Sequence, residues 1–486
     1  MLIFILFLLP LLSIFNIIIL NRNYKNLFSL SLIWCCCIFF YSFFLLNLSF
    51  FDDLIQISSN LLWGLKEENI FYWGPINFSI DFISFIFILL SNLLIIICII
   101  ISWNTINILK KEFILCLMIT NFLLIGVFSS MDILIFYIFF EAILIPIFLI
   151  ISIWGARDQR FKASYYFFFY TLFGSLFMFI TIFKIFFDIG STSFLILCSN
   201  STEYQYWFII AFFLSLAIKV PMFPVHIWLP QAHVEAPVSG SVLLAGILLK
   251  LGGYGFLRFS LPLLPEGAMF LSPLILALSI VSIIYASILT VKQTDIKRLI
   301  AYSSVSHMGF VTLGLFSYSI EGILAALILM IAHGFVSSGL FIAATVIYDR
   351  VHSRIIRNLK GLLLAMPLLA TLFLILTLAN ISIPGSLNFW GELLAFKSSF
   401  ISIIGIYLTI LILLSIVIGA IYSINLFNTV FFGVFIKSIN YIRDVNKKEF
   451  FVLFILSTLT WSIGIATFKI SYLYTLNIYN LVCFFS

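Results

Sequence analysis

Residues 219–233 read KVPMFPVHIWLPQAH and join two long apolar runs. The stretch holds one lysine, three prolines and two histidines. Proline breaks a helix and an ionisable side chain is costly in lipid, so a membrane-crossing helix normally avoids both. Such a break is tolerated only where protein shelters the backbone or where the backbone lines a water-filled cavity. The stretch therefore predicts a polar interior within the fold that the rest of the chain forms.

The composition of the chain is that of a membrane protein. Of the 486 residues, 63% are hydrophobic and only 9% are charged. Apolar windows of about 18 residues or more recur from end to end, and they are unbroken, as in FILLSNLLIIICIII at 87–101. A membrane β-barrel would instead show alternating segments of roughly ten residues. We predict an all-α polytopic membrane protein with a single membrane domain.

About fourteen transmembrane helices of roughly 20 residues each fit the apolar runs. Loops after odd-numbered spans carry most of the 25 lysine and arginine residues, and loops after even-numbered spans carry few. This alternation follows the positive-inside rule, so the basic loops face the matrix or cytoplasm and both termini face the other side. The net charge of +6 then reflects topology, not a nucleic-acid site. The predicted span centres lie near residues 10, 38, 90, 120, 142, 175, 217, 248, 280, 308, 334, 378, 415 and 460.

Several ionisable side chains fall at membrane depth. Each charge costs about 2.5–3.5 kcal/mol in lipid, so we expect these side chains to pair or to face water. Well inside the spans are Glu141, Lys219, Lys250, Glu392, His307 and His333. Near span ends, and expected to snorkel to the interface, are Lys184, Arg258, Lys397 and Lys469. Asp132 precedes a span and is expected to cap its helix. The first group predicts a buried hydrophilic path.

Two predicted spans carry proline close to such a charge. Pro221 and Pro224 follow Lys219 in the seventh span, and Pro384 precedes Glu392 in the twelfth. Broken helices at matching positions of two halves are typical of inverted repeats around a transport path. Because the two spans are five apart, and five is odd, we predict two inverted five-helix repeats, formed by spans 4–8 and 9–13, each with a broken helix.

These repeats divide the chain into four parts. In this frame Glu141 of the first repeat corresponds to His307 of the second. The predicted parts are the first three spans at 1–108, the first half-channel at 109–262, the second half-channel at 263–434, and a loop with the last span at 435–486.

The sequence contains the long motifs KVPMFPVHIWLPQAHVEAPVSGSVLLAGILLKLGGYG, DIKRLIAYSSVSHMGF, MIAHGFVSSGLF and NISIPGSLNFWGE. These motifs resemble those of the proton-pumping, antiporter-like membrane subunits of respiratory complex I. The resemblance covers about residues 110–430, whereas the first hundred residues match mainly in hydropathy. Mrp-type sodium/proton antiporter subunits share much of the signature and are the alternative.

The resemblance implies a proton route through this chain. It implies that Glu141 and Lys219 form the pair of the first half-channel, and that Lys250 is the central relay. It implies that Glu392 is the terminal site of the second half-channel, where related subunits often carry lysine. The residues that match the connecting polar axis are His226, His307 and His333.

The resemblance also implies a setting. NADH, flavin, iron–sulfur clusters and quinone are expected on other subunits, so no cofactor or metal is expected in this chain. Expected partners are other membrane-arm subunits, including neighbouring antiporter-like ones, and lipids, but no nucleic acid. The run MLIFILFLLPLLSIF at the start is typical of a first span, not of a presequence. The 58 phenylalanines indicate AT-rich coding DNA, so we expect a mitochondrially encoded protein of the inner membrane, with a bacterial inner membrane as the alternative.

Other classes of protein explain the sequence less well. A haem-binding membrane redox subunit would use His307 and His333 as axial ligands, but two helices each with paired histidines are not found in the sequence. A structural scaffold would have no need of Lys219 and Lys250 inside its spans.

Metal and disulfide frameworks are also disfavoured. A zinc site formed by His226, His233 and Glu235 is conceivable, but proline interrupts the segment and no cysteine is near. We expect His233 in a loop. The seven cysteines lie mostly in apolar runs without C-x-x-C spacing, so we interpret them as small hydrophobic residues.

Overall fold

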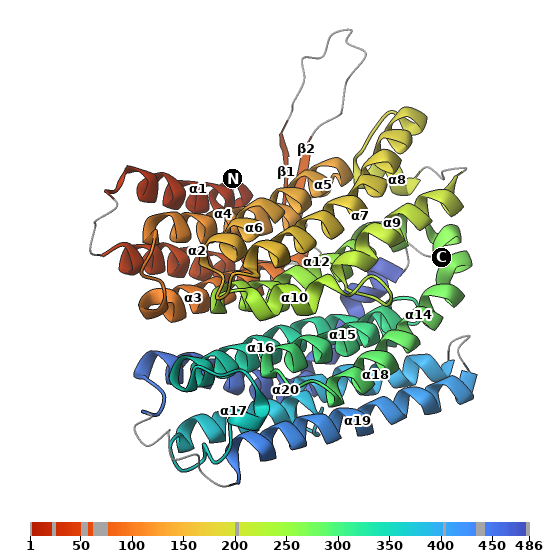
Figure 1. Cartoon of the computed structure of the whole chain (residues 1–486). Coiled ribbons are helices and arrows are strands. Elements are labelled where there is room, and N and C mark those ends of the chain that lie inside the picture. The colour runs from red at the N-terminus through yellow and green to blue at the C-terminus, as the bar shows by residue number, and fades with distance from the viewer. Residues whose placement is uncertain are drawn as a thin grey trace. The chain divides into compact units, whose positions relative to one another are not determined.

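The computed structural model describes residues 2–21, 26–49, 57–61, 76–199, 204–401, 405–433 and 443–482. Nearly all of the described chain is helical (Figure 1). The exception is one antiparallel hairpin of β1 (Ile57–Leu61) and β2 (Ile76–Ile80), in which Ile57 lies opposite Ile80. The predicted all-α class is confirmed.

The helices follow one another with short connections. The first half of the chain contains α1 (Leu2–Ile19), α2 (Leu27–Ser49), α3 (Phe82–Thr105), α4 (Lys110–Ser129), α5 (Ile133–Ala142), α6 (Leu144–Trp154), α7 (Arg160–Ile189), α8 (Phe194–Ser199), α9 (Gln205–Lys219), α10 (Trp228–Glu235) and α11 (Val238–Leu243). The remainder contains η1 (Leu244–Leu248), α12 (Leu249–Gly255), η2 (Phe256–Ser260), α13 (Leu261–Leu263), α14 (Pro265–Val291), α15 (Ile296–Leu315), α16 (Ile320–Val351), η3 (Ile356–Asn358), α17 (Pro367–Asn380), α18 (Leu387–Ile401), α19 (Gly405–Phe431) and α20 (Lys447–Val482).

Every predicted span centre falls inside a helix. Within the described residues, 11 helical segments are long and apolar enough by themselves to cross a membrane. The helices α9 and α17 are apolar but short, with 15 and 14 residues, because each ends at one of the predicted breaks. The multi-pass architecture with a broken helix in each half is therefore confirmed.

The chain forms two compact units. The first comprises the residues up to Leu216 together with Arg258–Ala268. In it β2 is tied to the start of α5, because the Met131 amide donates to the Asn77 carbonyl at 3.0 Å. Asp132 caps α5 as predicted, and its carboxylate also accepts a hydrogen bond from the Thr192 hydroxyl at 2.9 Å. Burial raises the pKa of Asp132, although this hydroxyl acts against the shift.

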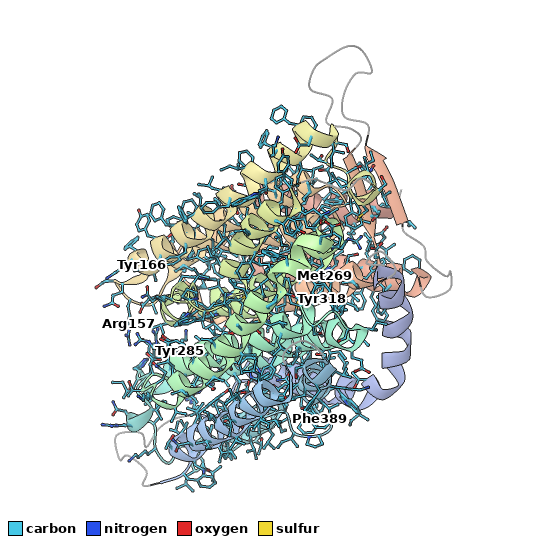
Figure 2. All side chains as sticks on the ribbon, turned by 90° about the vertical axis from the view of Figure 1, so that its right-hand side faces the viewer. Arg157, Tyr166, Met269, Tyr285, Tyr318 and Phe389 are labelled. Carbon is cyan, nitrogen blue, oxygen red and sulfur yellow. The ribbon has the colours of Figure 1, made fainter. Side chains whose placement is uncertain are left out.

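The helix α7 in the first unit carries a row of exposed aromatic side chains, including Tyr166 (Figure 2). Lipid is as apolar as a protein core, so aromatic and aliphatic side chains on an outer helix face can contact lipid and need not be buried in the protein. The other exposed rings of the row are Phe161, Tyr165, Phe169, Phe173 and Phe177.

The second unit comprises Ala217–Leu257 and the residues from Met269 onward. Its centre is α16, whose membrane-length apolar window is completely buried. This helix packs against α11, α15, α17, α18 and α20. A helix surrounded in this way can carry a histidine without exposing it to lipid, and α16 carries His333.

Candidate functional site: a buried chain of titratable groups

The first helix break separates α9 from α10 at residues 220–227. A break frees carbonyl groups that must find new donors, since no water is available in lipid. The Met222 amide donates to the Ala217 carbonyl at 3.0 Å. The Trp228 indole donates to the Ile218 carbonyl at 2.9 Å. These bonds satisfy the backbone beside Lys219, so the chain itself stabilises the break.

The second helix break separates α17 from α18 at residues 381–386. Gly385 sits there with a φ of +96°, a conformation that favours glycine. The Trp390 indole donates to the Gly464 carbonyl of α20 at 2.9 Å. Gly464 lies so close to the break that a methyl group on it would collide with the backbone of Gly385 and Leu387. The second break is therefore supported by the neighbouring helix α20.

Lys250 is completely buried on α12, directly after the π-helical turn η1. A π-turn fits one more residue into a helix than the α-helix does, and such turns are frequent at functional sites. The Lys250 ammonium donates to the Ala245 carbonyl within this turn. Its Nζ also lies 2.9 Å from Nδ1 of His333 on α16. The lysine is thus held between a carbonyl oxygen and an imidazole.

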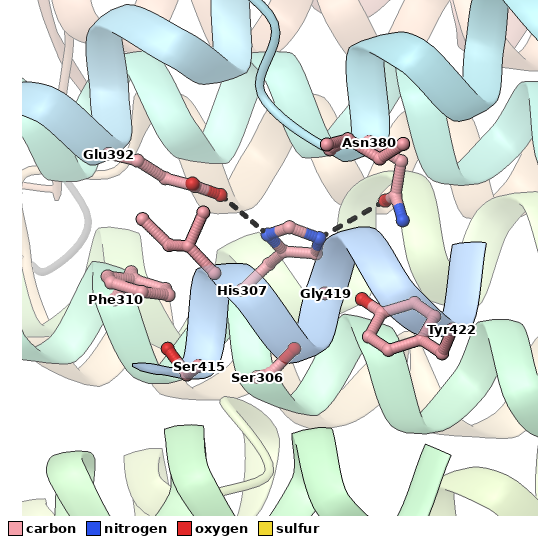
Figure 3. A pocket seen from close by; sticks show the side chains of 10 residues that line it. Ser306, His307, Phe310, Asn380, Glu392, Ser415, Gly419 and Tyr422 are labelled. Atoms are coloured by element: carbon pink, nitrogen blue, oxygen red, sulfur yellow. Dashed lines mark hydrogen bonds and ion pairs between the residues drawn. The ribbon is translucent and has the colours of Figure 1, made fainter. Parts of the chain in front are cut away.

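The chain of titratable groups continues from His333 to α15 and α18. The rings of His333 and His307 have centroids 5.7 Å apart. Nδ1 of His307 lies 3.2 Å from Oε1 of Glu392, and Nε2 lies 3.1 Å from Oδ1 of Asn380 (Figure 3). The structure therefore brings together four of the predicted residues, Lys250, His333, His307 and Glu392, in one buried series inside the second unit.

A small cavity of about 20 Å³ lies beside His307 (Figure 3). Ser306, Asn380, Glu392, Ser415 and Tyr422 supply its polar lining. A water molecule needs about 10–15 Å³ and two to four polar partners, so the cavity has room for one water molecule. Such a water would extend the path between His307 and its neighbours.

The predicted pair of the first half-channel is divided between the units. Glu141 lies half-buried on α5 of the first unit, one helical turn after Tyr137. Lys219 is the last residue of α9, belongs to the second unit and is 2% exposed. Their pairing stays a prediction.

His226 lies within the first break and is buried among aromatic rings. Its ring centroid is 5.9 Å from that of Phe223 and 5.6 Å from that of Tyr285. In the part of the chain that the structure describes, no three His, Cys, Asp or Glu side chains are grouped to hold a metal ion.

Two expectations for polar residues were wrong. His233 does not lie in a loop but on α10, fully buried, with its ring stacked on Phe341 at 4.4 Å. Pro230 does not prevent this helix because it stands in the first turn, where its missing amide hydrogen is not needed.

Arg258 does not snorkel but is buried in an ion pair with Asp81. By contrast, the Lys184 and Lys397 side chains are 52% and 58% exposed, as snorkelling predicts, and the Lys469 side chain lies outside the described residues.

The sequence analysis also missed three neutral groups of the site: Asn380, Ser306 and Tyr422. All three line the small cavity beside His307. Their signal in the sequence is weak, because serine and asparagine occur in many helices without a functional role. The position of Asn380 was the available clue, since it ends α17 as Lys219 ends α9.

Known proteins similar to this chain share both its motifs and its fold. Residues 130–419 match the family described as NADH:quinone oxidoreductase/Mrp antiporter, transmembrane. The chain is 48% identical over 416 residues to NADH-ubiquinone oxidoreductase chain 4 of Metridium senile. The aligned residues cover 85% of this chain and 84% of that one. It is 45% identical over 463 residues to the protein of the same name from Chondrus crispus, and the aligned residues cover 94% of this chain and 92% of that one.

Solved structures give the same result for the fold. A chain of respiratory complex I from Thermus thermophilus with bound NADH superposes with a TM-score of 0.86 at 28% identity, and 100% of both chains is covered. A chain of the archaeal membrane-bound sulfane sulfur reductase has a TM-score of 0.84 at 22% identity, covering 94% of this chain and 75% of that one. The second likeness concerns the fold alone.

Proposed function

The chain belongs to the family of NADH-ubiquinone oxidoreductase chain 4, and on that premise we propose that it is a proton-translocating subunit of the membrane arm of respiratory complex I. One observation carries the proposal. The Lys250 ammonium lies 2.9 Å from His333, and the series continues through His307 to Glu392 without leaving the buried interior of the second unit. Burying four titratable side chains within a membrane is costly, and a protein that only anchored others in the membrane would gain nothing from that cost.

Proton transfer along this series follows from the chemistry of its members. Protonated Lys250 donates to Nδ1 of His333 and becomes a neutral amine. His333 passes a proton toward His307, directly or through water, and Nδ1 of His307 then protonates the Glu392 carboxylate. Each step moves one proton between groups that can exist in both protonation states. The path needs no redox chemistry in this chain.

The first half-channel is proposed to work through Glu141 and Lys219. Its support is the correspondence between the repeats. In the second repeat His307 lies 3.1 Å from Asn380, which is the last residue before the break in α17. Glu141 and Lys219 hold the matching places in the first repeat, and His226 follows Lys219 on the proposed connecting axis. A carboxylate that approaches a lysine raises the pKa of the lysine, and its departure lowers it. A change in their distance would therefore drive a proton toward Lys250.

The proposed setting follows from the relatives. NADH, flavin, iron–sulfur clusters and quinone would be bound by other subunits, and their redox reaction would drive this chain. The partners would be other membrane-arm subunits, including neighbouring antiporter-like ones, and lipids. The location would be the mitochondrial inner membrane, with the basic loops toward the matrix, in keeping with the sources of the relatives.

The main alternative is an Mrp-type sodium/proton antiporter subunit, since the matching family includes both. The curated relatives at 43–48% identity favour complex I. Purification of the native complex tests this choice. We expect flavoprotein and iron–sulfur subunits to co-purify, and a complex made only of antiporter subunits would contradict the proposal.

The haem alternative is disfavoured because His307 and His333 already contact Glu392, Asn380 and Lys250.

The relay itself is tested by Lys250→Met in the assembled complex. The apolar chain of methionine preserves volume but carries no proton, so we expect the share of NADH-driven proton transport that passes through this chain to fall by about 100-fold. The matched control is Lys397→Met, since this exposed lysine stands on α18 five residues after Glu392 and pairs with Glu321. Proton yield per NADH is measured in vesicles. A normal yield in Lys250→Met would refute the relay.

A further inference from the structure

A second and larger cavity adjoins the site described above. It has a volume of about 270 Å³ and lies between the loop after α14, the turn η3 and the last two turns of α19. We call it the vestibule. Its polar lining includes Lys292, Gln293, Arg357, Asn425 and Thr429. Lys292 and Arg357 are exposed and belong to the basic loops, so the vestibule lies on the basic-loop side of the second unit.

Tyr422 is the residue that the vestibule shares with the small cavity beside His307. It is 4% exposed, so its ring fills the space between the two cavities. It lines the small cavity together with Asn380, and the Asn380 carbonyl oxygen lies 3.1 Å from Nε2 of His307. A line of polar atoms therefore leads from the vestibule through Tyr422 to His307 and Glu392.

The helix α19 has a polar stripe that follows this line. Ser415 and Gly419 line the small cavity, Tyr422 lines both, and Asn425 and Thr429 line the vestibule. These residues recur every three or four positions and thus occupy one face of the helix, over a length of about 20 Å. The other faces of α19 are apolar and exposed, for example at Leu414, Val417 and Ile421. A polar stripe on an otherwise apolar membrane helix marks a path for water or ions.

We propose that Tyr422 is a proton gate through which the His307–Glu392 site exchanges protons with water on the basic-loop side. This inference rests on the proposed function, and it adds to it a place of access and a residue that controls it. A tyrosine hydroxyl both donates and accepts hydrogen bonds, so it can pass a proton while its ring excludes bulk water. Ser306 lines the same cavity, and its hydroxyl donates to the Ser303 carbonyl, so its oxygen can still accept a hydrogen bond from Tyr422.

The first test removes the hydroxyl and keeps the ring. In Tyr422→Phe, proton transport per NADH in the assembled complex should fall by at least about tenfold, and the rate should become more sensitive to replacement of H₂O by D₂O. The control is Tyr166→Phe on the exposed face of α7, which should change neither quantity. Unchanged transport and an unchanged isotope effect in Tyr422→Phe would overturn the gate.

The second test maps access to the two cavities without relying on proton transport. A small charged thiosulfonate reagent is added from the basic-loop side, with the parent chain as the background. Asn425→Cys in the vestibule should react. Ser306→Cys should be protected while Tyr422 is present, and should react at least about tenfold faster when combined with Tyr422→Ala, because loss of the ring opens the path.

The labelling result separates this inference from the proposed function. An unreactive Asn425→Cys, or a Ser306→Cys whose reactivity does not depend on residue 422, would overturn the gate even if Lys250→Met abolishes proton transport. A normal proton yield in Lys250→Met would refute the relay even if the labelling pattern is the expected one.

Discussion

The two broken helices of this chain use the same backbone device for different chemistry. The first break follows a buried ammonium group, Lys219, and is closed by the Trp228 indole from within its own segment. The second follows a neutral amide, Asn380, and is supported by α20 from outside. The first half therefore places its charge before the break, whereas the second places Glu392 after it, on α18. A repeated fold can thus keep its geometry while the proton-carrying residue moves to the other side of the break.

The largest effect is expected from exchanging the chemistry of the first break for that of the second. Lys219→Asn retains a hydrogen-bonding side chain but removes the charge that switches, so proton transport per NADH should fall by about 100-fold. Removal of the amide at the second break by Asn380→Ala, measured in the same vesicle assay, should reduce transport by only about tenfold, because a neutral bridge can be replaced by water. Equal losses in both variants would show that the two breaks do the same chemistry.

A smaller effect is expected where α20 supports the second break. Gly464→Ala would force a methyl group against the backbone of Gly385 and Leu387, at a cost of about 1–3 kcal/mol. The neighbouring side chain of Ile465 is 70% exposed, so Ile465→Ala is the control and should have little effect. The thermal unfolding midpoint of the purified complex and hydrogen exchange at 381–390 report the change. Unaltered exchange in Gly464→Ala would mean that the break does not depend on α20.

The smallest effect is expected from one of the two tryptophans at the breaks, Trp390. Trp228→Phe leaves the buried Ile218 carbonyl without its indole donor, at a cost of about 1–3 kcal/mol. Trp390→Phe should cost less, about 0.5–1 kcal/mol, because the Gly464 carbonyl also accepts a hydrogen bond from the Thr467 hydroxyl at 2.6 Å. We expect amide hydrogen exchange to become faster at 217–222 in Trp228→Phe. In Trp390→Phe we expect a smaller change in exchange, at 460–468. The reverse order would contradict this account of the first break.

The helices and the buried charges of this chain could be predicted because lipid imposes strict rules. A backbone in lipid must be helical, and a charge there is costly enough to be conspicuous in the sequence. Neutral partners obey no such rule. Ser306, for example, bonds to the carbonyl of Ser303 in its own helix, which many serines do without further consequence. The roles of Asn380 and Tyr422 thus depend on tertiary contacts that hydropathy does not encode.

Long-range ion pairs were equally inaccessible to the sequence analysis. Arg258 stands near a span end, where snorkelling is the ordinary expectation. Its partner Asp81 precedes α3, far away in the sequence, and their pairing follows only from how the helices of the first unit fold together. His233 was misplaced for a different reason, since a proline-rich segment favours a loop, whereas Pro230 stands in the first turn of α10, where a helix tolerates proline.

The direction in which Lys250 points depends on the π-turn η1, because this turn holds one residue more than a regular α-helical turn would. A regular α-helix advances about 100° per residue, and the π-turn takes up one extra residue without that advance, so regular winding of 244–248 at unchanged length would turn Lys250 by about 100° relative to α11. Its ammonium group would then point away from His333, although no side chain of the relay had been changed. A relative that lacks one residue here and winds as a regular α-helix would keep its lysine on the same face, aligned with Lys250 across a one-residue gap. Alignment columns that ignore this winding would record a lost lysine where only the numbering has slipped.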